Sequence, residues 1–157
     1  DISKEDLDDK ILNFKEHMKT LPLIDVMFPI GVKNVKKYTR KGDGIFAVRM
    51  KGTPVHVKSA LNYNDMLKHL KVTKVREIIN GEKIKWTYLK TNNMGLDTMA
   101  MKGFEDPEPI VKFVQSYINY DKVFKSAFAN KLNDFYGAMK WGRIPENNNL
   151  GKFFAFG

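Results

Sequence analysis

Apolar positions recur at helical spacing near the start of the chain, at Leu7, Ile11, Phe14 and Met18. Intervals of three and four residues place these side chains on one face of a helix. Ser3 is a suitable N-cap, and the acidic residues of the first turns favour the positive end of the helix dipole. We therefore predict an amphipathic surface helix over residues 2–19.

Residues 21–60 follow no single period and are interrupted by glycine and proline. Gly42-Asp43-Gly44 predicts a turn, and Gly52-Thr53-Pro54 predicts another loop. We expect this segment to be irregular with some β-structure. Residues 62–70 then predict a short helix that Asn62 caps.

Two strand patterns follow in the middle of the chain. After the turn at Asn80-Gly81, residues 82–90 alternate apolar side chains with charged ones. A second strand is expected over residues 97–102, after the loop 91–95. These two strands predict a small antiparallel sheet.

Helical spacing returns in the last third of the chain. Asp106-Pro107 can open a helix, because proline is well tolerated in a first turn. The apolar face of this helix is formed by Ile110, Phe113, Val114 and Tyr117. A longer helix is predicted over residues 121–140, and the polar run Pro145–Asn149 predicts a linker.

The fold class expected from these elements is α+β. A helical domain with a small antiparallel sheet insertion should occupy residues 1–145. Residues 146–157 should form a linker and a flexible C-terminal tail that turns abruptly apolar at Leu150.

Charge is distributed unevenly along the 157 residues, which carry a net charge of +9. Residues 33–90 contain fifteen basic and four acidic side chains, whereas residues 1–30 contain four basic and seven acidic ones. A local excess of this size attracts phosphate backbones or anionic membranes. No apolar stretch is long and uninterrupted enough to predict a membrane span.

The sequence lacks the residue patterns that several kinds of catalytic site require. The chain has no cysteine, and its three histidines do not form a metal-ligand spacing. The carboxylates are scattered rather than paired for two-metal phosphoryl transfer, and no glycine-rich phosphate loop precedes a Lys-Ser/Thr pair. We expect a binding module without cofactors. Because the chain begins at Asp1 rather than Met, we also expect an N-terminal remainder to be missing.

The basic run over residues 33–41 is the first candidate for binding. Phosphate contact would use Lys36, Lys37, Arg40 and Lys41. Composition supports equally the alternative that this run is a solvated hairpin. Residues 55–64 with Lys68 are a second candidate that mixes cationic, hydroxyl and amide donors, although composition alone favours a strand leading into a helix.

The aromatic tail is the third candidate. Phe153, Phe154 and Phe156 follow a polar linker, which favours docking into a hydrophobic pocket of another protein. The alternative is that the tail packs on its own domain.

These segments, taken in order, resemble the C-terminal region of the family-B replicative DNA polymerase of T-even-type bacteriophages. The matching segments are His56–Asn64, Asn80–Ile84, Asn93–Asp97, Ile118–Asp121 and Phe128–Lys140, followed by the tail Leu150–Gly157. No single motif is diagnostic, and the collinear order carries the resemblance. The pattern departs from the family around Ser126 and Asn130, where the chain is less basic.

The resemblance implies a polymerase thumb that grips the primer-template duplex. It implies that Lys58, Tyr63, Asn64, Lys68 and Lys131 lie near DNA. It also implies that the tail binds a sliding clamp through Leu150, Phe153, Phe154 and Phe156. The catalytic Mg²⁺ ions would belong to a palm and exonuclease part, in the same or a separate chain.

The expected function is therefore a non-catalytic thumb of a DNA-directed DNA polymerase in phage DNA replication. It would act in the cytoplasm of the infected bacterium. The main alternative is a free-standing basic protein that binds nucleic acid or the clamp. A membrane-surface protein fits less well, because the basic residues do not line a long amphipathic helix.

Overall fold

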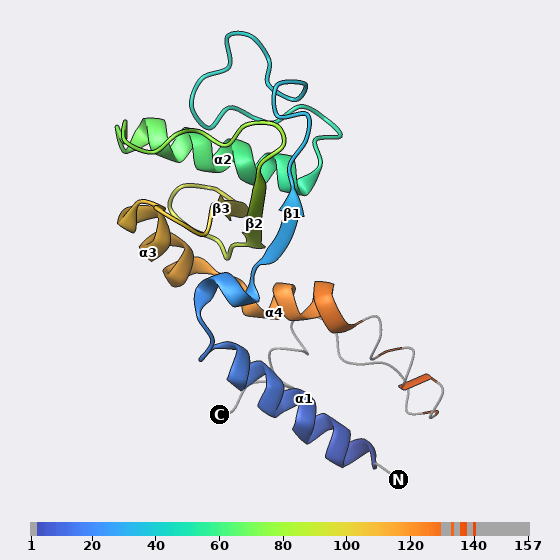
Figure 1. Ribbon diagram of the computed structural model, residues 1–157. Coiled ribbons are helices and arrows are strands. Elements are labelled where there is room, and N and C mark those ends of the chain that lie inside the picture. The colour runs from blue at the N-terminus through green and yellow to red at the C-terminus, as the bar shows by residue number, and fades with distance from the viewer. Residues whose placement is uncertain (1–2, 130–132, 134–135, 138–139, 141–157) are drawn as a thin grey trace. The chain divides into compact units, whose positions relative to one another are not determined.

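The computed structural model describes residues 3–129, 133, 136, 137 and 140. These residues form two units, one from residues 1–26 with 119–157 and one from residues 27–118. The fold class is α+β, as predicted, with a three-stranded antiparallel sheet beside helices (Figure 1).

The sheet belongs to the second unit and has the order β1-β2-β3. Its strands are β1 (Phe28–Gly31), β2 (Lys83–Tyr88) and β3 (Thr98–Met101). The predictions over residues 82–90 and 97–102 are confirmed by β2 and β3. Strand β1 was not predicted as such, and it tolerates Pro29 because it lies at the sheet edge, where a missing N–H loses little.

Helix α2 (Val55–His69) packs against β3 and is longer than predicted. It begins after Pro54, so the predicted start at Asn62 is wrong. Asn62 lies buried inside the helix, where its Nδ2 donates to the carbonyl oxygen of Thr98 at 3.0 Å. All residues from Ser59 to Leu67 are buried. Their packing explains why α2 is a helix, although its β-branched residues favour a strand.

Helix α3 (Glu108–Tyr117) begins directly after Pro107, as predicted. Its face buries Ile110 and Val114. Beyond the helix, Ile118 forms a bridge with Leu89, which follows β2. This arrangement connects the C-terminal end of the second unit to its sheet.

The first unit contains α1 (Lys4–Met18), η1 (Leu23–Val26), α4 (Tyr120–Phe124) and the π-helical turn η2 (Lys125–Ala129). Ser3 caps α1 as predicted, since its Oγ accepts from the amide of Asp6 at 3.1 Å. Phe14 of α1 packs edge-on against Phe128 with ring centroids 5.1 Å apart. Of the helix predicted over residues 121–140, only the beginning and isolated later positions lie within the described residues.

Two polar contacts add to this packing in the first unit. Lys15 pairs with Asp121, and the hydroxyl of Tyr136 donates to a carboxylate oxygen of Asp8. Both contacts join α1 to residues after 119, so the first unit is assembled from the two ends of the chain. No described helix has the length and apolar character needed to cross a membrane.

Candidate nucleic-acid interface

The second unit carries the whole net charge of the protein. Residues 27–118 contain seventeen Lys and Arg against eight Asp and Glu, while the remaining residues contain ten of each. The first unit is therefore neutral overall, and the second has a net charge of +9. The net positive charge that would attract a polyanion lies in one structural unit.

A long loop over residues 32–54 connects β1 to α2 and contains the predicted basic run. In Figure 1 this loop, drawn in cyan, arches over the α2 side of the unit. Its start is fixed where the amide of Val35 donates to Oδ1 of Asn80 at 2.7 Å. The exposed lysines of the loop are thus held on a folded scaffold rather than on a hairpin.

The middle of the loop is fixed by the buried carboxylate of Asp65 in α2. One oxygen of Asp65 accepts from the amide of Phe46 at 3.0 Å and from Nη2 of Arg49 at 2.6 Å. Phe46 has a φ of 59°, a left-handed conformation that is unfavourable for a bulky side chain. Such strain persists where surrounding contacts determine the backbone, and Asp65 supplies those contacts here.

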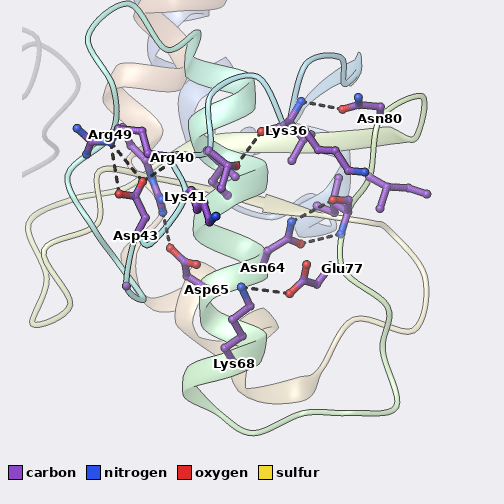
Figure 2. A pocket seen from close by; sticks show the side chains of 16 residues that line it. Lys36, Arg40, Lys41, Asp43, Arg49, Asn64, Asp65, Lys68, Glu77 and Asn80 are labelled. Atoms are coloured by element: carbon purple, nitrogen blue, oxygen red, sulfur yellow. Dashed lines mark hydrogen bonds and ion pairs between the residues drawn. The ribbon is translucent and has the colours of Figure 1, made fainter.

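A cavity of about 650 Å³ lies between this loop, α2 and residues 77–80 (Figure 2). Five of its lining side chains are basic and three are acidic. The basic ones are Lys36, Arg40, Lys41, Arg49 and Lys68. Apolar lining comes from Val35, Leu61, Ile78 and Ile79.

The acidic side chains of the cavity are engaged with neighbouring cations. Asp65 pairs with Arg49 at 2.6 Å, Asp43 with Arg40 at 3.3 Å, and Glu77 with Lys68 at 3.5 Å. Lys36 and Lys41 are exposed and form no ion pair with the described residues. Among the cations that line the cavity, these two ammonium groups are the most readily available to a phosphate.

The structure brings together four of the predicted DNA-binding residues. Lys36, Arg40 and Lys41 of the long loop line the same cavity as Lys68 of α2. Lys37 is exposed on the same loop, with its ammonium group 5.5 Å from the centre of the Tyr38 ring.

Lys58 lies away from this group. Its Nζ pairs with Oδ2 of Asp97 at 2.7 Å, and it lines a separate hollow with Gly95 and Leu96. A phosphate at Lys58 would have to compete with the carboxylate of Asp97.

Tyr63 and Asn64 are buried and form hydrogen bonds within the fold, so their side chains are not accessible to DNA. The hydroxyl of Tyr63 donates to Oδ1 of Asp106 at 2.8 Å. Burial raises the pKa of Tyr63 far above its ordinary value, and the hydrogen bond to Asp106 raises it further. Asn64 uses both amide atoms on the backbone of Ile78, at 2.6 and 3.0 Å.

The remaining predicted residues lie outside the described residues. They are Lys131 and the four clamp-binding residues Leu150, Phe153, Phe154 and Phe156. Their assigned contacts stay predictions.

Sequence reasoning did not identify Arg49 and Asp65 as partners. They are far apart in sequence and sit in segments predicted differently, one as loop and one as part of a short helix. The sequence signal that could have pointed to this pair was Asp65 itself, an acidic residue within an otherwise basic segment. Only the fold shows that its carboxylate organises the basic loop.

Among the described residues, no group of three or more His, Asp or Glu side chains is placed to hold a metal ion. Neither a scan against protein-family models nor a search of curated proteins finds a match for this chain.

Proposed function

We propose that the chain binds the backbone of duplex DNA as the thumb part of a family-B DNA polymerase. The observation that supports this best is the confinement of the +9 net charge to residues 27–118. Phosphate contacts of this kind dominate affinity and need no base-specific pattern.

Exposed lysines on several segments of the second unit provide the contacts. Nine of them form no ion pair with the described residues: Lys33, Lys36, Lys37, Lys41, Lys51, Lys71, Lys74, Lys83 and Lys90. They come from the long loop, from the segment after α2 and from β2 with its flanks. Because they have no ion pair with the described residues to break, their contact with phosphate costs little beyond side-chain entropy.

The resemblance to T-even-type phage polymerases assigns the role of this binding. The thumb would hold the newly made duplex, while a palm and exonuclease part in the same or another chain would bind Mg²⁺ and perform catalysis. The protein would then work in the cytoplasm of the infected bacterium.

A salt titration of duplex binding tests the DNA-binding part of the proposal. If about four phosphates are neutralised, log K should fall with log salt at a slope of about −3.6. Two duplexes of unrelated sequence should bind with equal affinity. Salt-independent binding, or a strong preference for one sequence, would contradict the proposal.

The tail provides a separate test of the polymerase role. We propose that Leu150, Phe153, Phe154 and Phe156 anchor the polymerase to its sliding clamp. Deleting residues 150–157 should spare DNA binding but abolish stimulation of long-product synthesis by the clamp. Full stimulation of the truncated polymerase would show that the tail is not the link.

A further inference from the structure

We propose that the cavity between the long loop, α2 and residues 77–80 binds one unpaired nucleotide, with its phosphate at the exposed lysines and its base against the exposed side chain of Ile79. The inference rests on the proposed nucleic-acid binding and extends it from backbone contact to a specific structural state of DNA. Unpaired nucleotides of this kind occur in bulges, at frayed ends and in single strands of DNA.

The size of the cavity favours more than a phosphate contact. At about 650 Å³ it falls within the usual range of small-molecule sites, roughly 300–1,000 Å³. A backbone phosphate requires only an exposed cation. Stacked base pairs cannot enter a concave site of this kind, whereas a single base outside the stack can.

The cavity is lined by charged side chains, which Figure 2 labels, and by apolar ones. Lys36, Lys41 and Lys68 supply ammonium groups to the lining, and among the described residues Lys68 pairs with Glu77 at 3.5 Å. Ile79 lines the cavity with a residue exposure of 48%, so its apolar side chain is accessible to a ligand. A base can pack on such an apolar surface, because the contact removes part of its face from water whatever the base.

The cavity is also preorganised. The side-chain amide of Asn64 forms hydrogen bonds with the backbone of Ile78, and Oδ1 of Asn80 accepts a hydrogen bond from the amide of Val35. Asp65 holds Phe46 and Arg49 on the opposite side. Because these contacts lie within the protein and hold the lining in place, binding has little ordering cost to overcome.

The test compares three DNAs of equal length by isothermal titration calorimetry with the full chain. One is a fully paired duplex, one carries a single bulged thymidine, and one carries an abasic bulge at that position. The thymidine bulge should bind about tenfold more tightly than the abasic bulge, as expected for one base packed on a protein surface. Equal affinity for the two bulges would overturn the inference.

Two variants locate the effect. Ile79→Ser should reduce the ratio between thymidine and abasic bulge toward one, while leaving affinity for the paired duplex unchanged. The double variant Lys36→Ala with Lys41→Ala should weaken bulged DNA more than paired DNA. The matched control, Lys71→Ala with Lys74→Ala, removes the same charge outside the cavity lining and should weaken all three DNAs equally.

The outcomes separate this inference from the proposed function. Equal binding to all three DNAs would overturn the nucleotide site alone. Tight binding to the thymidine bulge without binding to the paired duplex would overturn the duplex proposal alone. If Ile79→Ser keeps its fold by circular dichroism and retains the parent ratio, the base does not lie in this cavity.

Discussion

Asp65 is an acidic residue that holds part of the proposed DNA-binding surface in place. Its carboxylate accepts from Arg49 and from the strained Phe46 backbone, and thereby holds the loop that carries Lys36, Lys37 and Lys41. Simple Coulomb attraction predicts that removing an acid strengthens DNA binding. A positioning role predicts the opposite for this residue.

Asp65→Asn should therefore weaken duplex binding and lower the free energy of unfolding by about 1–3 kcal/mol, because Arg49 loses its charged partner. Hydrogen exchange at the Phe46 amide should accelerate. Glu77→Gln is the control, since it removes an acid from the same cavity without releasing the loop, and it should strengthen binding. If both variants bind more tightly than the parent, Asp65 does not position the loop.

Tyr63 gives a prediction on pH dependence. Its pKa is raised in the folded state by burial first and by Asp106 second, whereas an unfolded tyrosine titrates near pH 10. The stability that follows from this shift is complete below about pH 10 and is lost as pH rises above it. Tyr63→Phe should therefore show a shallower loss of stability between about pH 10 and 12 in urea unfolding. An unchanged slope would argue against the buried, protonated hydroxyl.

At the scale of elements, α2 serves as the central support of the second unit. Its buried polar residues reach three different segments: Asn62 binds Thr98 in β3, Asn64 binds Ile78, and Asp65 binds the long loop. A helix with polar side chains at these positions would be unstable alone. Here each group is satisfied by a backbone or charged partner, so the helix specifies where the loops lie.

Asn64→Ala tests this support directly. The substitution leaves the amide and the carbonyl of Ile78 without their partner in a buried position, which should cost about 2–3 kcal/mol of stability. Thermal or urea unfolding measures the loss. A change below about 0.5 kcal/mol, the range typical of surface substitutions, would contradict the role assigned to Asn64.

At the scale of the whole molecule, the two units differ in net charge. Residues of the neutral first unit should contribute little to DNA binding, although that unit contains ten basic side chains. The basic residues of the second unit should carry the salt dependence.

A pair of double variants distinguishes the units. Lys71→Ala with Lys74→Ala should reduce the magnitude of the salt slope by about 2, since each lysine neutralises about one phosphate. Lys10→Ala with Lys19→Ala, both on or beside the acidic helix α1, should leave the slope unchanged. Equal effects of the two pairs would contradict the division of charge between the units.

The sequence by itself determined the features that depend on neighbouring residues. The period of the apolar positions predicted α1 and α3, and Ser3 and Pro107 marked their starts correctly. Alternation after a turn predicted β2, and the segment after the loop over residues 91–95 was predicted as the strand that is β3. The excess of lysine and arginine over residues 33–90 is a property of the sequence alone, and it led to the proposed DNA binding.

Only the tertiary structure decided what depends on residues distant in the chain. Because α2 packs against β3, it begins at Val55 rather than at the predicted Asn62. Asn62, which was predicted to cap the helix, lies inside it and donates a hydrogen bond to Thr98. The same packing removed Tyr63 and Asn64 from the surface. It also joined Asp65 to Arg49 and gathered Lys36, Arg40 and Lys68 around one cavity. Local patterns cannot specify these pairings, because the partners are brought together by the burial of apolar surface between separate elements.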